Sequence, residues 1–288
     1  MSGRAAAPRP FRWALSGIAA RNRLVGVVVA ALCALAGNEL RAEAVPVRYP
    51  EGLVHGFLTL RTQDGRTIAD GDLSQVASGA QVTSRLTFHF RDGSLYDETA
   101  VFTQRDQFRL VSYRMVQKGK SFPRPLEMSI DSGTGQVDVR YTDDEGETKT
   151  ESERMELPPD LANGLVQTLL KNVRSAPLSL SYVAATPKPR LVKLEITTAA
   201  PARFSTGQRG RTATHYVLKV EIGGLSGLLA PLVGKQPPDT HVWILGGDAP
   251  AFVKAEQPFY AGGPVWRVEL ASPAWPRSAK PPARRAGN

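Results

Sequence analysis

The sequence predicts a mainly β protein built on curved antiparallel sheet, of the half-barrel or open-barrel kind, with one packed amphipathic helix. Three observations point to this fold class. Short segments alternate apolar and polar residues with the period of two that a half-buried strand requires. Turns such as Asp64-Gly65 and Asp92-Gly93 separate these segments at hairpin spacing. Helical periodicity is convincing only once, near residues 160–173.

The chain begins with a segment that has the features of an export signal. Residues 1–23 carry five arginines and no acidic residue, and the apolar run 24–36 follows them. This run is shorter than the roughly 20 residues that cross a bilayer. It leads to Ala42-Glu43-Ala44, which has the small-x-small form of a cleavage site. We therefore expect residues 1–44 to be removed after Ala44, leaving a periplasmic or secreted protein; the alternative is an uncleaved N-terminal helix that anchors the chain.

Cysteine content and charge limit the classes of partner. Cys33 is the single cysteine, and Leu32 before it is too large for lipoprotein-type processing, so we expect neither a lipid anchor nor a disulfide in the mature chain. Of the net charge of +9, residues 1–44 contribute +4 and residues 271–288 another +4, which leaves +1 for the body. A nearly neutral body without a basic stripe argues against a nucleic-acid partner.

Residues 45–185 are interpreted as an antiparallel meander followed by the helix. Leu86, Phe88 and Phe90, for example, alternate with polar residues, which is typical of a sheet with one solvated face. We expect strands near residues 53–62, 66–74, 81–91, 95–104, 107–117, 126–131, 136–142 and 147–156.

The helix is predicted from a stop signal and an apolar stripe. Leu157-Pro158-Pro159 ends the preceding strand, and Asp160 is placed to cap the first turn. The stripe consists of Leu161, Leu165, Val166, Leu169, Leu170 and Val173. It is typical of a core-packing face, so we expect the helix to cover the meander and a change of Lys171 to have little effect.

Residues 186–270 are predicted to be a second β segment of the same sheet system. Strands are expected near 192–196, 216–222, 240–245, 251–257 and 265–270, and a domain boundary near 185–189 is left open. Residues 223–234 form an apolar stretch without charge, which must be buried or contact something apolar. Residues 271–288 are rich in Pro, Arg and Ala and are expected to be a disordered basic tail.

No motif specifies a reaction, a metal or a cofactor, so we assign no catalytic residue, no metal ligand and no cofactor. The four histidines, His55, His89, His215 and His241, lack partners at a recurrent metal spacing. Lys235, Asp239 and His241 lie within seven residues, close enough for acid–base chemistry if the loop folds back. A proline-rich turn before a buried strand is the favoured interpretation of that loop.

Five segments carry a family resemblance: Asp92–Ser94, Phe122–Pro125, Leu157–Gly164, Ala230–Asp239 and Gly263–Arg267. They resemble a family of exported bacterial β-rich proteins with a domain of unknown function, over nearly all of the mature chain. The resemblance extends loosely to lipoprotein-carrier-like half-barrels, in which a curved sheet wraps a helix. It supplies no catalytic or binding residues.

Three functional hypotheses follow. The first is an envelope protein that binds a lipid-like apolar ligand in the curved sheet, through Leu225, Leu228, Leu229, Leu232 and Trp243. The second is an envelope structural or interaction protein without a small ligand, whose partner is another envelope protein and whose basic tail contacts the membrane surface. The third is a hydrolase-type enzyme that uses Lys235, Asp239 and His241.

Overall fold

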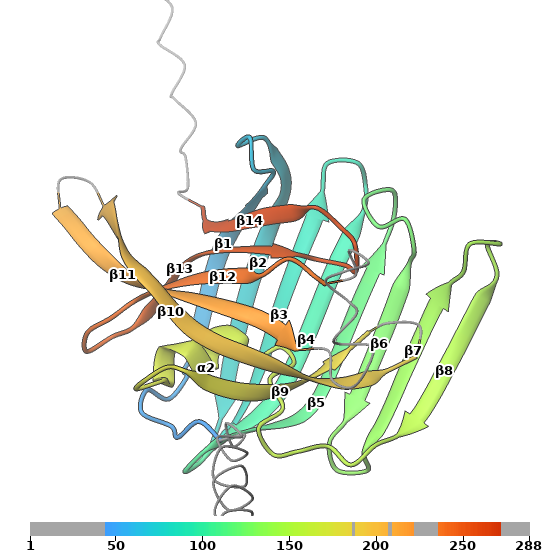
Figure 1. Ribbon diagram of the computed structural model, residues 1–288, viewed down its shortest axis with the longest axis horizontal. Helices are drawn as coiled ribbons and strands as arrows, with labels where there is room; N and C mark the ends of the chain where they lie inside the picture. Colours follow the sequence, from blue (N-terminus) through green and yellow to red (C-terminus); the bar gives the residue numbers. More distant parts are fainter. Residues whose placement is uncertain (1–43, 186–187, 207–208, 222–235, 272–288) are drawn as a thin grey trace, which may run out of the picture. The chain divides into compact units, whose positions relative to one another are not determined.

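The computed structural model describes residues 44–185, 188–206, 209–221 and 236–271 (Figure 1). Within these residues, fourteen strands form one antiparallel sheet that stays open, accompanied by one short α-helix, α2 (Val166–Asn172). The predicted fold class, mainly β with a single packed helix, is therefore confirmed. None of the described helical residues forms a segment long and apolar enough to cross a membrane.

The first eight strands form a meander in which each strand pairs with the next. Their bounds are β1 (Val54–Arg61), β2 (Thr67–Ser78), β3 (Gln81–Phe90), β4 (Leu95–Gln104), β5 (Phe108–Lys118), β6 (Leu126–Asp131), β7 (Gln136–Thr142) and β8 (Thr148–Arg154). Gly65 and Gly93 have φ values of 91° and 85° in the first and third turns. Such left-handed backbone favours glycine, which explains the turn signals in the sequence.

The other six strands extend the same sheet beyond β1. They are β9 (Leu178–Ala184), β10 (Arg190–Thr206), β11 (Arg209–Glu221), β12 (Thr240–Leu245), β13 (Ala251–Pro258) and β14 (Val265–Leu270). β1 pairs with β2 along one edge and with β14 along the other, with Leu58 opposite Leu270. The first and last strands thus join the two halves, and β8 and β9 form the edges of the sheet.

Aromatic side chains from the two halves pack together in the core. Phe259 follows β13, and its ring centroid lies 5.0 Å from that of Tyr96 in β4 and 5.7 Å from that of Phe88 in β3. Trp266 in β14 lies 5.4 Å from Phe90 and 6.1 Å from Phe122. In Figure 1, β9 to β14 cross in front of the meander strands, in keeping with these contacts.

The helix is shorter than the 160–173 range that the sequence predicts. Asp160 does not cap it; its Oδ2 accepts hydrogen bonds from the backbone N–H (3.1 Å) and the hydroxyl (3.2 Å) of Ser181 in β9. Asn163 likewise accepts from the N–H of Val183 and donates to its carbonyl. Residues 160–163 therefore pair with the edge strand β9, which competes with helix formation, and α2 begins only after Leu165.

Candidate functional site

The residues proposed to contact an apolar ligand are mostly not placed by the structure. Leu225, Leu228, Leu229 and Leu232 lie outside the described residues. Trp243 is in β12, where its neighbours Val242 and Ile244 belong to the hydrophobic core. The Trp243 ring lies on the other face, stacked on His215 at 4.2 Å and 12°, with the Lys254 ammonium 3.9 Å from its ring centroid. Trp243 therefore takes part in a polar cluster of the outer face.

The structure describes two of the three suggested acid–base residues. Lys235 lies outside the described residues, and Asp239 is exposed in the segment before β12. His241 is in β12, and its Nδ1 lies 2.9 Å from Nε2 of His215 in β11. Burial lowers the pKa of His215, and the neighbouring His241 and Lys254 lower it further. The sequence did not reveal this pair, because only the β11–β12 register brings the two histidines together.

A cleft of about 430 Å³ lies where the N-terminal segment, the end of α2 and strands β10 to β12 meet. We call it the basic cleft. Its polar lining includes Arg48, Lys171, Arg174, Thr198, Thr214 and Tyr216. These residues come from four separate parts of the chain, so no local motif signals the cleft.

Asn172 fixes the N-terminal wall of the basic cleft. Its side chain is fully buried, and Oδ1 accepts hydrogen bonds from the backbone N–H groups of Arg48 (2.8 Å) and Tyr49 (2.7 Å). Its Nδ2 donates to the carbonyl of Thr168 at 2.9 Å. One amide thus ties the extended N-terminal segment to the last turn of α2.

The charge of Lys171 is compensated. Its Nζ contacts the carboxylate of Glu51, and the two side chains are only 18% and 6% exposed. Glu51 is held in turn by Gln104, whose amide donates to the Glu51 carbonyl at 2.8 Å. The sequence predicts that a change of Lys171 has little effect, because Lys171 lies off the apolar stripe. Its largely buried ion pair argues against that prediction.

Arg48 and Arg174 are left as the uncompensated cations of the basic cleft. Both are exposed, and within the described part of the chain neither forms an ion pair with a carboxylate. Tyr216 lies beside them, and its burial raises its pKa although Arg48 acts in the opposite direction. Its hydroxyl therefore stays protonated near neutral pH and can donate a hydrogen bond.

A second polar group lies on the core face of the sheet. The hydroxyls of Tyr96 and Tyr113 both donate to Oε2 of Glu98, at 2.6 and 3.0 Å. Across the strands, Glu98 stands between Leu86 and Met115. Burial in these apolar surroundings raises the pKa of Glu98, although the two hydroxyl bonds favour the charged form.

Replacing Glu98 with glutamine is expected to flatten the dependence of stability on pH. Because folding raises the pKa of Glu98, its contribution to stability is fully present below the unfolded pKa and is lost as pH rises through the folded pKa. Glu98→Gln cannot ionise, so its Tm relative to wild type should be higher at pH 8 than at pH 4. Thermal melts followed by circular dichroism measure this difference. Glu127→Gln, at an exposed ion pair with Arg114, is the control, and an equal pH profile in both variants would contradict the assignment.

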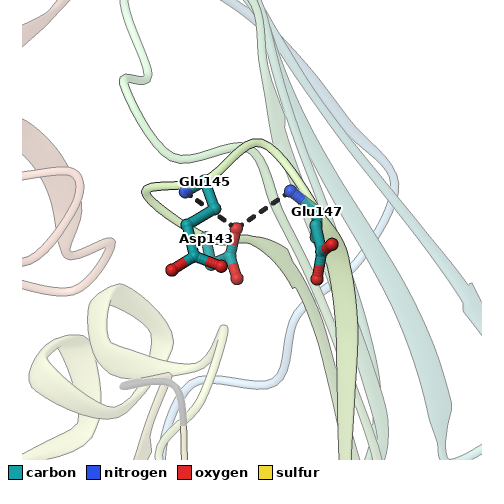
Figure 2. Close-up of side chains that lie close together, drawn as sticks. All are labelled: Asp143, Glu145 and Glu147. Carbon is teal, nitrogen blue, oxygen red and sulfur yellow. Dashed lines mark hydrogen bonds between the residues drawn. The ribbon is translucent and has the colours of Figure 1, made fainter.

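Three carboxylates gather at the turn between β7 and β8, and Figure 2 shows them together. Oxygens of Asp143, Glu145 and Glu147 lie within 4.8 Å of one another. Asp143, however, accepts the backbone N–H groups of Glu145 (3.0 Å) and Glu147 (2.9 Å) and pairs with Lys149. These bonds, with that to Lys149 foremost, lower the pKa of Asp143. The cluster is thus explained as an Asp-stabilised turn.

Comparison with known proteins assigns no function. No described protein family matches the sequence, and no curated protein matches it. A solved structure, a β-barrel-like protein of domain of unknown function DUF1849 from Brucella abortus, matches with a TM-score of 0.42 and 10% sequence identity. The match covers 80% of this chain and 97% of that chain.

Proposed function

We propose that the chain is an exported, non-catalytic binding protein of the cell envelope that holds an anionic group in the basic cleft. The observation that carries this proposal is the pair of exposed arginines, Arg48 and Arg174, which face one cleft without a carboxylate partner among the described residues. Guanidinium groups bind carboxylates and phosphates through paired N–H donors. The hydroxyls of Thr198, Thr214 and Tyr216 add further donors.

The charge of the cleft favours the binding of an anion. The charged side chains among its described lining residues, Arg48, Lys171 and Arg174, are all basic. An anion therefore finds both positive charge and hydrogen-bond donors there.

A lipid-like ligand remains part of the proposal. The leucines predicted to contact it, Leu225, Leu228, Leu229 and Leu232, lie outside the described residues. The headgroup of an anionic lipid and a free soluble anion present the same chemistry to the two arginines, so both sources are tested.

An interaction protein without a small ligand is the second candidate. Leu53, Phe57 and Val76 are 84%, 52% and 53% exposed. They lie near the paired ends of β1 and β2, where Val54 stands opposite Gln75. Exposed large apolar side chains on neighbouring strand ends are typical of a protein contact surface, and these favour a protein partner.

The anion proposal is tested with inorganic phosphate and with lipid vesicles. Calorimetric titration with phosphate, and flotation with phosphatidylglycerol or phosphatidylcholine vesicles, are compared for wild type and the double variant Arg48→Gln, Arg174→Gln. Each charged hydrogen bond contributes about 1.5–3 kcal/mol, so we expect at least a tenfold loss of affinity. Arg140→Gln, at an exposed site on β7, is the matched control.

The two probes separate the sources of the anion. Phosphate binding without vesicle binding indicates a soluble ligand, and selective binding to phosphatidylglycerol indicates a lipid headgroup. Binding that is equal in wild type and the double variant, or binding to neither probe, would overturn the proposal.

Export predicts a defined mature N-terminus. Val45 would be the first residue after cleavage, and its side chain is only 5% exposed while its carbonyl accepts the N–H of Phe108 at 3.2 Å. We expect N-terminal sequencing of protein from the envelope fraction to begin at Val45 or within a few residues of it. Recovery of intact Met1 would favour the anchored alternative.

A further inference from the structure

Two histidine side chains meet on the outer face of the sheet, away from the basic cleft residues described above. His215 in β11 stands opposite Trp243, and His241 lies two residues before Trp243 in β12. Nε2 of His215 and Nδ1 of His241 are 2.9 Å apart, and both side chains are half-buried. This pair has no part in the anion site.

We infer that His215 and His241 chelate one divalent transition-metal ion, with Cu²⁺ preferred. Two imidazole nitrogens about 2.0–2.1 Å from a metal and about 90° apart are separated by about 2.9 Å. The observed separation of 2.9 Å fits two adjacent positions of a tetragonal site. Water molecules complete the coordination, because the half-buried rings leave the outer side accessible.

The neutral forms of both rings can serve as ligands. A neutral imidazole keeps one proton, and the described residues provide no hydrogen-bond partner for Nδ1 of His215 or Nε2 of His241. Each proton can reside on that free nitrogen while the facing nitrogens bind the metal. The ion thus replaces the hydrogen bond between the rings, and Trp243 holds the plane of His215 by stacking at 4.2 Å.

Two cations and one carboxylate lie close to the histidine pair. Lys254 and Arg267 each have a nitrogen 3.0 Å from Oε1 of Glu256. Glu256 stands directly opposite His241 in the register of β12 and β13. Its carboxylate offsets one of the two positive charges next to the proposed metal.

The donor atoms select the class of metal. Imidazole nitrogens suit copper, nickel and zinc, and among these Cu²⁺ forms the most stable complexes. Calcium and magnesium prefer oxygen ligands, so the histidine pair should not bind them. Titration with Ca²⁺ or Mg²⁺ is therefore a control for the nitrogen ligands.

The test is titration of tag-free protein with Cu²⁺, followed by calorimetry and electron paramagnetic resonance. Wild type should bind one equivalent with hyperfine structure from nitrogen ligands. His215→Asn and His241→Asn should each lower the affinity at least tenfold. His89→Asn, at an exposed site on β3, is the control and should bind as wild type does.

Stability provides a second measurement. The two ligands lie on different strands, so folding assembles the site, and Cu²⁺ should raise the Tm of wild type but not of the histidine variants. If an asparagine variant fails to fold, the corresponding His→Gln variant takes its place. Undiminished Cu²⁺ affinity in both variants, absence of stoichiometric binding, or loss of binding in Glu145→Gln would each overturn the inference.

Discussion

Replacement of Leu165 with aspartate is expected to unfold the β domain. Leu165 precedes α2 and is only 1% exposed, within the same hydrophobic core as Leu169 and Phe102. A carboxylate at this position would be buried without a partner, at a cost of several kcal/mol. That cost is a large part of the roughly 5–15 kcal/mol by which domains are stable. Circular dichroism should show that the variant is already unfolded at physiological temperature, and heating should produce no cooperative transition.

Two companion variants make this result specific. Leu169→Asp, at a position 3% exposed, should behave like Leu165→Asp. Leu53→Asp, at a position 84% exposed, introduces the same charge but should leave the melt nearly unchanged. A Leu165→Asp protein with the Tm of wild type would show that the segment before α2 is not packed as described.

Asn172→Ala should lower the free energy of unfolding by about 3 kcal/mol, since it leaves the N–H groups of Arg48 and Tyr49 and the carbonyl of Thr168 without this partner. It should also weaken phosphate binding, because Asn172 holds Arg48 at the wall of the basic cleft without itself contacting an anion. Urea denaturation and phosphate calorimetry below the transition measure the two effects separately.

The control for Asn172 is Gln136→Ala. Gln136 also makes side-chain hydrogen bonds, to Asp138 and Ser152, but it is on β7 and its side chain is partly exposed. Its loss should cost less than about 1 kcal/mol and leave phosphate affinity unchanged. If Asn172→Ala lost stability but kept full phosphate affinity, a role in positioning Arg48 would be ruled out.

The strands of the meander could be predicted because their signals are local. In β3, alternation places Phe88 and Phe90 in the core, and glycine turns set the ends of the hairpins. The same reasoning located β6 at 126–131 and β12 at 240–245 with their observed bounds.

Features that depend on distant pairing were missed. The strand β9 was not predicted, although Leu178, Leu180 and Tyr182 alternate with serines. The predicted helix begins near residue 160, which is too early. Asp160 accepts hydrogen bonds from β9, and only the tertiary fold brings the two together. The basic cleft and the histidine pair combine separate segments, so spacing in the sequence could not reveal them.

The position of β1 in the sheet has a consequence for the order of folding. β1 needs both β2 and β14 as neighbours, and these two strands lie at opposite ends of the described sequence. When the chain emerges from a translocon in the order of its sequence, the meander can form early, but one row of β1 backbone groups lacks partners until residues 265–270 emerge. During that interval this row, with Phe57 exposed beside it, is a sheet edge open to wrong pairing. The pairing of β1 with β14 therefore ends the period in which this edge is exposed.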